Sequence, residues 1–239
     1  MKTAKVTAGR GISWIKSGIG FVTDRPVVWI GGTAATIGLS IVLNFIPLLG
    51  QILSQILSFG MGIFFLSYAQ KQKNKVEFDL DVTWNQVKGR LPRLILLMLL
   101  SSALAFACVL LVVGTLAVVG GLQYASQGRF PSTLPTGSLI ALGISGLIAV
   151  IGFYYIMAAT SFTTPLILLQ NLSIRQALGL SLQAVTRNVG PLFVYFLLLA
   201  LFMLICIIPF GLGLLLGFPA ITASFYVAYE ELLGRPDTL

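Results

Sequence analysis

Six long stretches of the chain contain no charged side chain, and they constrain the fold more than any other feature of the sequence. A helix needs about 20 apolar residues to cross roughly 30 Å of hydrocarbon. The sequence therefore predicts an all-α fold, a polytopic transmembrane helical bundle of about six spans arranged in hairpins. The third span is overlong and is expected to tilt or to project from the membrane. The six expected spans are Val27–Leu49, Ile52–Gln70, Leu94–Leu122, Ser138–Thr160, Pro191–Ile208 and Leu212–Tyr229.

The composition excludes an ordinary soluble domain. Only 9% of the residues are charged and 57% are hydrophobic, whereas soluble domains carry roughly 25% charged residues. The apolar runs are continuous rather than alternating, which excludes a transmembrane β-barrel. We therefore expect one integral membrane domain over residues 1–239.

The basic residues lie almost entirely on one side of the predicted spans. All but one of the 15 lysines and arginines fall in the segments before span one, between spans two and three, between spans four and five, and after span six; the remaining one is Arg129. The positive-inside rule then predicts that both termini are cytoplasmic. We interpret this charge as a mark of topology and of contact with anionic lipid headgroups, and not as a nucleic-acid surface.

The beginning and the end of the chain resemble each other. Phe64–Tyr68 aligns without gaps with Phe225–Tyr229, and Gly50 then aligns with Gly211. A weaker third copy in the middle would make a parallel repeat, although similar turns also recur in unrelated helical hairpins. The three candidate units are residues 6–70, 81–160 and 173–232.

An amphipathic segment precedes the first and the last pair of spans, and we expect both segments to form helices in the membrane interface. Ser173 and Gln176 have the spacing of a capping box at the start of the second segment. In the middle unit, Asp81 is expected to cap a short helix that carries Trp84 and Val87.

The sequence lacks the residues on which most membrane chemistry depends. It contains no histidine and no nucleotide-binding or hydrolase motif, and no aspartate, glutamate, lysine or arginine lies inside a predicted span. We therefore expect no catalytic residue, no metal and no cofactor. The one arrangement worth testing for catalysis is Asp79 and Asp81 near Ser173, and its spacing does not favour an enzyme.

Polar side chains follow the first hairpin toward its turn. Asn44 on span one and Gln51 and Gln55 on span two are expected to meet near the outer surface. Two interpretations remain open: amides that hydrogen-bond between packed helices, or an outward-facing polar cavity.

Two further features point to contacts. The candidates for binding anionic lipid, or a partner protein, are Lys71, Lys73, Lys75, Arg90 and Arg93. On span four, Ala141, Ser145, Ala149 and Gly152 are spaced as a helix-packing seam, either within the chain or between copies.

Short motifs resemble a family of uncharacterised bacterial inner-membrane proteins. They are Gly11–Gly18, Arg25–Trp29, the turn Ile46–Gly50, and the stretch from Thr164 to Tyr229. The chain is also similar to the membrane domain attached to some glycerophosphodiester phosphodiesterases. The resemblance implies a six-span bundle with interfacial helices in the bacterial inner membrane, and it assigns no activity.

Two functions follow as hypotheses. The first is a non-enzymatic accessory or scaffolding subunit of a larger membrane assembly. The alternative is a transporter or lipid-translocating protein, which requires a cavity at membrane depth lined by Asn44, Gln51 or Gln55.

Overall fold

The computed structural model describes residues 3–234 apart from residues 8, 48, 129–134 and 209–210. This part of the chain forms ten α-helices and no strand, so the predicted all-α fold is confirmed. The helices are α1 (Arg10–Asp24), α2 (Pro26–Leu43), α3 (Leu49–Lys73), α4 (Leu80–Lys88), α5 (Leu91–Gln127), α6 (Thr136–Ser161), α7 (Thr163–Gln170), α8 (Ile174–Arg187), α9 (Val189–Ile207) and α10 (Leu214–Leu233).

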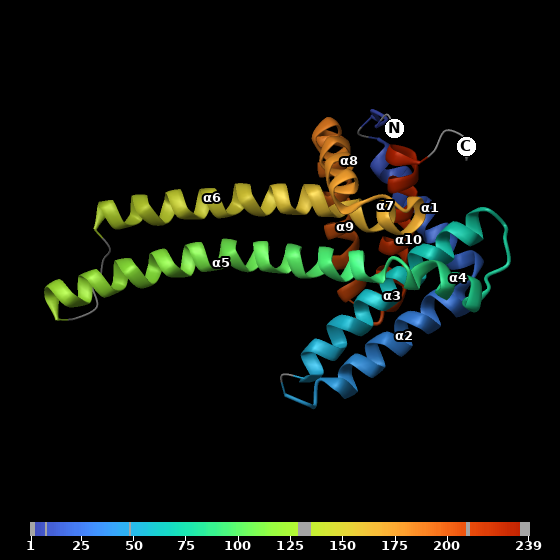
Figure 1. Cartoon of the computed structure of the whole chain (residues 1–239), viewed down its shortest axis with the longest axis horizontal. Coiled ribbons are helices and arrows are strands. Elements are labelled where there is room, and N and C mark those ends of the chain that lie inside the picture. Colours follow the sequence, from blue (N-terminus) through green and yellow to red (C-terminus); the bar gives the residue numbers. More distant parts are fainter. Residues whose placement is uncertain (1–2, 8, 48, 129–134, 209–210, 235–239) are drawn as a thin grey trace.

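Three helical hairpins, α2–α3, α5–α6 and α9–α10, meet at one end and leave it in different directions (Figure 1). We call the shared end, together with the short helices α1, α4, α7 and α8, the hub, and the far ends of the hairpins the tips. A short helix precedes each hairpin, so the order of short helix, long helix, turn and long helix occurs three times. The common origin of the three units stays a prediction.

The junctions between the short helices and the hairpins are alike. Arg25 between α1 and α2 has φ −135° and ψ 61°, and Asn188 between α8 and α9 has φ −125° and ψ 32°. Three residues before these junctions, Val22 and Val185 are both buried. At the turns, a Cβ on Gly50 would lie 1.8 Å from the carbonyl oxygen of Leu43, near the end of α2. The matching close approach in the last hairpin belongs to Gly213, seven residues after Cys206, and not to Gly211.

Two of the short helices pack on the second long helix of another hairpin. Helix α1 crosses α10 so closely that a Cβ on Gly18 would lie 2.5 Å from the carbonyl oxygen of Ala220. Helix α8 lies against α6, where the Ser181 hydroxyl donates to the carbonyl of Ala158 (2.9 Å) and accepts from the amide of Phe162 (3.0 Å).

The middle unit packs on α3 through Phe78, which lies two residues before the start of α4. Its ring contacts Phe64 at 5.2 Å and Tyr68 at 5.3 Å between centroids. Asp79 caps α4, because its carboxylate accepts from the amides of Asp81 and Val82. The cap expected at Asp81 is therefore wrong by two residues, whereas the capping box of Ser173 and Gln176 is confirmed.

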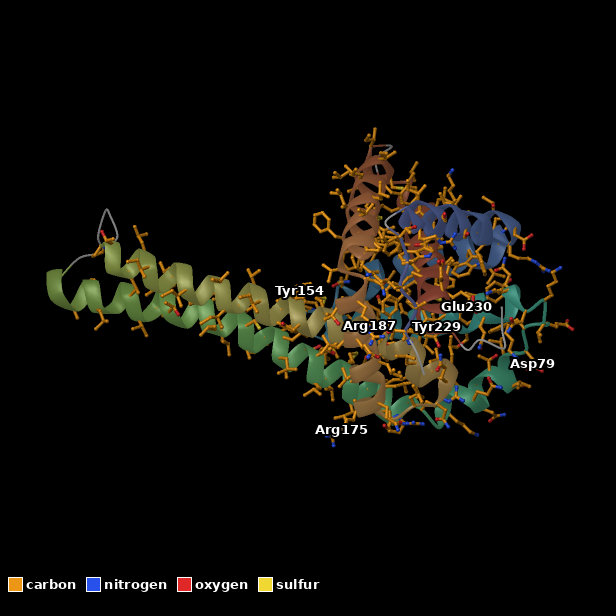
Figure 2. All side chains as sticks on the ribbon, turned by 90° about the horizontal axis from the view of Figure 1, so that it is seen from above. Asp79, Tyr154, Arg175, Arg187, Tyr229 and Glu230 are labelled. Carbon is orange, nitrogen blue, oxygen red and sulfur yellow. The ribbon has the colours of Figure 1, made fainter. Side chains whose placement is uncertain are left out.

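The buried core lies in the hub. Trp14, Trp29, Phe162 and Tyr195 are fully buried there, whereas α5 has no buried side chain among its described residues beyond Leu97. The α5–α6 pair extends far from the hub with its side chains pointing outward, and Tyr154 lies near its hub end (Figure 2). Within the pair, Ser145 is buried and Gly152 meets the thiol of Cys108, so the small residues of α6 face α5.

Five segments of the described chain are long and apolar enough to cross a membrane, namely α2, α3, α5, α6 with α7, and α9. The sixth expected span corresponds to α10, which is not among these five segments and carries Glu230 and Glu231 in its last turn before it ends at Leu233. This helix lies among α1, α2, α3 and α9 and is the most enclosed of the long helices. It therefore does not need the lipid-facing apolar surface that the other long helices carry. The chain is a multi-pass helical membrane protein.

Candidate functional site

A groove of about 670 Å³ runs between α2, α3 and α10 on the tip side of the hub. Most of its wall is apolar, but hydroxyl and amide groups recur along it. It is lined by Thr33, Thr36, Ile37, Ser40, Ile41, Asn44, Phe45, Ser58, Met61, Gly62, Phe65, Phe218 and Thr222. The residues of α2 recur every three or four positions, so they form one face of that helix.

The amide of Asn44 lies at the tip end of the groove. Its Nδ2 donates to the carbonyl oxygen of Ser40 (2.7 Å) and to the hydroxyl of Ser54 (3.1 Å). Gln51 and Gln55 are exposed and do not line the groove. The structure thus does not bring together the three amides expected from the sequence, and Ser54 takes the place of the glutamines beside Asn44.

The three threonine hydroxyls along the groove already donate hydrogen bonds to their own helices. Thr33 donates to the carbonyl of Trp29 (2.8 Å), and Thr36 donates to the carbonyl of Gly32 (2.7 Å). Thr222 on α10 makes the same four-residue bond to Phe218 (3.1 Å). These hydroxyl oxygens can still accept a hydrogen bond. The groove therefore offers neutral acceptors and no charge to a ligand.

An aromatic cluster closes the hub end of the groove. Trp29 is fully buried, stacks on Phe65 with 4.8 Å between ring centroids, and meets Tyr68 edge-on at 5.7 Å. The indole Nε1 donates to Gln72 Oε1 (2.9 Å). Gln72 in turn donates from Nε2 to the carbonyl of Phe21 (2.9 Å), which ties the cluster to α1.

A second hollow, of about 980 Å³, lies on the other side of this cluster. Phe64 and Tyr68 form part of its wall, so the aromatic cluster separates it from the groove. Its charged lining residues are balanced between two acids and two bases. The lining residues are Asp24, Arg25, Val28, Phe64, Tyr68, Gln72, Lys75, Val76, Glu77, Phe78 and Leu80.

The five basic residues selected from the sequence do not form one patch. Lys73 pairs with Glu230 at 2.5 Å, and Lys75 lines the hollow that also contains Asp24 and Glu77. Lys71 and Arg90 line a separate polar pocket of about 300 Å³.

Both arginines of that group bind backbone carbonyls, Arg90 near the end of α7 and Arg93 in the segment that links α7 to α8. Arg90 donates to the carbonyl of Leu168. Arg93 donates to the carbonyl of Leu172 (3.0 Å) and to Asn171 Oδ1 (2.6 Å). Burial lowers the pKa of Arg90, and the neighbouring charge of Arg93 lowers that pKa further.

Glu231 joins α10 to α1 and was not recognised from the sequence, where it reads as a tail residue. Its carboxylate accepts from Arg10 Nε (2.6 Å), Arg10 Nη2 (2.7 Å) and Trp14 Nε1 (2.7 Å). Burial alone would raise the pKa of Glu231, but the bonds from Arg10 and Trp14 outweigh it, and the pKa is lowered. The contact stabilises the hub and does not resemble a catalytic site.

Two of the three residues considered for catalysis, Asp79 and Ser173, have structural roles as helix caps. Asp79 caps α4, and the Ser173 hydroxyl takes part in the capping box of α8. In the described ranges of the chain, no group of three or more acids and cysteines is arranged to hold a metal ion.

Comparison with known proteins adds no family to this description. No protein-family model matches the chain, and neither a curated protein nor a solved structure shows significant similarity to it.

Proposed function

We propose that the protein binds an amphiphilic lipid in the groove between α2, α3 and α10 and helps it to move across the membrane. The observation that carries the proposal is a groove at span depth, lined by Asn44 and closed at its hub end by Trp29. Its volume of about 670 Å³ falls within the roughly 300–1,000 Å³ of ordinary ligand sites. The protein would contribute binding and orientation, with no enzymatic step of its own.

The chemistry of the wall favours a particular kind of ligand. An apolar wall suits an acyl chain, and a row of uncharged acceptors suits a hydroxyl or amine that donates hydrogen bonds. The aromatic cluster at Trp29 divides the groove from the hollow beside Arg25 and Lys75, so a ligand that crosses must displace this cluster. Alternating access requires two hollows on opposite sides of a gate, and in this proposal the aromatic cluster at Trp29 is the gate between the groove and the second hollow.

A groove-filling variant and a matched control test this function. Ser40→Phe places a ring inside the groove, whereas Leu39→Phe places the same ring on an exposed position of α2. In phospholipid vesicles, the native protein is expected to accelerate exchange of a fluorescent phospholipid analogue between leaflets, measured by chemical quenching from outside. Ser40→Phe should lower that rate, and Leu39→Phe should not. Equal rates for the two variants, or no acceleration by the native protein, would contradict the proposal.

A second candidate function, an accessory or scaffolding subunit, is favoured by the α5–α6 hairpin. Helix α5 has 37 residues and is about 55 Å long at about 1.5 Å per residue. Most of the pair contacts nothing else in the described chain, and its apolar side chains face outward. Purification from native membranes in mild detergent should then recover a partner at near-stoichiometric yield, and repeated recovery of this chain alone would count against that role.

We also propose that the protein resides in a bacterial inner membrane with its hub and both termini on the cytoplasmic side. The positions of the basic residues support this orientation, because Lys71, Lys73, Lys75, Arg90 and Arg93 all lie at the hub. Arg129, the one basic residue expected outside, lies beyond the described residues. Membership of the uncharacterised inner-membrane family that the sequence resembles belongs to the same proposal.

A further inference from the structure

The pocket that contains Lys71 and Arg90 differs from the other hollows of the hub in its charge. It lies between the end of α3, one face of α4 and the end of α7, and no acidic side chain lines it. The lining residues are Ser67, Gln70, Lys71, Asn74, Val76, Thr83, Gln86, Val87, Arg90, Leu168 and Leu169.

The two cations of this pocket have no anionic partner among the described residues. The side chain of Lys71 makes no ion pair there, and Arg90 donates only to the carbonyl of Leu168. Other cations of the hub provide a contrast, since Lys73 is neutralised by Glu230 and Arg10 by Glu231. A partly buried guanidinium without a counter-charge is unfavourable, and an anion in the pocket would relieve that cost.

Neutral hydrogen-bond donors surround the two charges. Gln70, Asn74 and Gln86 line the pocket, and their side-chain amides have no hydrogen-bond partner in the described part of the chain. The hydroxyls of Ser67 and Thr83 are already committed to backbone carbonyls of their own helices. Three free amides and two cations can together satisfy several acceptor oxygens of one group.

We propose that this pocket binds a phosphate group, with Lys71 and Arg90 as its cationic ligands. The phosphate belongs either to the headgroup of an anionic lipid or to a free phosphate ion, because the same side chains recognise both. The site is separate from the groove between α2, α3 and α10, and the proposal does not depend on lipid movement.

Binding of phosphatidylglycerol to the detergent-solubilised full chain, measured by native mass spectrometry, tests the site. Lys71→Gln should weaken binding at least tenfold, as expected for loss of a charge-assisted hydrogen bond. Lys88→Gln is the matched control, because it removes one charge from the exposed face of α4 outside the pocket. The control should change the affinity less than twofold. Equal weakening by both variants would mean diffuse attraction and would overturn the proposal.

Two further measurements complete the test. Lys71 makes no described contact that folding requires, but Arg90 holds α7, so Arg90→Gln is interpreted only if its circular dichroism and elution profile are native. Inorganic phosphate at millimolar concentration is then added to the native protein. If phosphate displaces the lipid, the pocket recognises the phosphate ion itself. If the native protein keeps the lipid while Lys71→Gln loses lipid binding, the pocket recognises the lipid headgroup. Absence of binding by both probes would refute the site.

Discussion

Replacement of Gly18 by alanine tests the contact on which the hub depends. A Cβ at this position would lie 2.5 Å from the carbonyl oxygen of Ala220 and 2.6 Å from the backbone nitrogen of Ser224, both on α10. Nonbonded carbon atoms pack best at about 3.5–4.0 Å, so α1 and α10 must separate by roughly 1 Å. A gap of this size forfeits up to about half of the dispersion energy of each contact across the crossing.

The same helix supplies a matched control in Gly20, which is exposed and has open space where a Cβ would be added. Both substitutions gain about 1 kcal/mol of helix propensity. That gain cancels when the two variants are compared, and the overpacking at Gly18 remains, at about 1–3 kcal/mol. Gly18→Ala should therefore be less stable than Gly20→Ala by about that amount.

Equilibrium unfolding in mixed micelles of a mild detergent and sodium dodecyl sulfate measures this difference. The buried indoles of Trp14 and Trp29 report the loss of the hub through their fluorescence. Equal unfolding free energies for Gly18→Ala and Gly20→Ala would show that α1 and α10 do not cross in this way, and the account of the hub would fail.

Two further predictions concern the hub and the long hairpin. The lowered pKa of Glu231 means that its contribution to stability is present above the ordinary glutamate pKa and is lost as the pH falls through the folded value. The unfolding free energy of the native chain should therefore fall as the pH is lowered through this range. Glu231→Gln leaves Arg10 unpaired, and its unfolding free energy should not show this dependence on pH. Gly152→Leu should force α5 away from α6, because even the Cβ of a substituted residue would lie 3.3 Å from the thiol of Cys108. In a background with Cys206 replaced, maleimide should label Cys108 faster in Gly152→Leu than in the control Gly146→Leu, where the added side chain meets open space. Equal labelling rates would contradict the packing of α5 on α6 at Gly152.

The sequence was informative wherever structure depends on local periodicity. The continuous apolar runs predicted the long helices, and the capping box at Ser173 was located to the residue because its signal lies within four positions. The end of α2 was harder to place. The expected span continued to Leu49, but α2 ends at Leu43, since the turn residues Phe45 and Ile46 are themselves apolar and give no break in hydropathy.

The error at that turn explains the error in the candidate site. Which face of α3 meets α2 depends on where the turn ends and α3 begins. Gln51 and Gln55 share one face of α3, one turn apart, whereas Ser54 and Ser58 share the face that meets α2. The two glutamines were chosen because they are polar. To choose the serines instead, one would have needed to know which face of α3 turns toward α2.

Long-range contacts lay beyond the sequence for a different reason. Glu230 and Glu231 sit near the chain end and read as solvated tail residues. Helix α10 continues to Leu233, and Lys73 and Arg10 reach these carboxylates from helices more than 150 positions away in the chain. Nothing in the spacing of such residues predicts that they meet. The phosphate pocket depends on the same kind of contact, because Leu168 of α7 completes a wall begun by α3 and α4.

The small residues of the hub connect its stability to the shape of the groove. In the short helix that precedes each hairpin (α1, α4 and α8), a small or hydroxyl-bearing residue precedes a buried valine by four positions: Gly18 and Val22, Thr83 and Val87, Ser181 and Val185. Lipid gives helices no hydrophobic reason to associate, so close approach at small residues and polar bonds must hold them together. Such close approaches and polar bonds between helices are concentrated in the hub, whereas the tips are surrounded mainly by lipid. Helix α10 forms one wall of the groove and is held by α1 at Gly18. A substitution that shifts this crossing should therefore change the width of the groove and the rate of lipid movement, although it lies outside the groove itself.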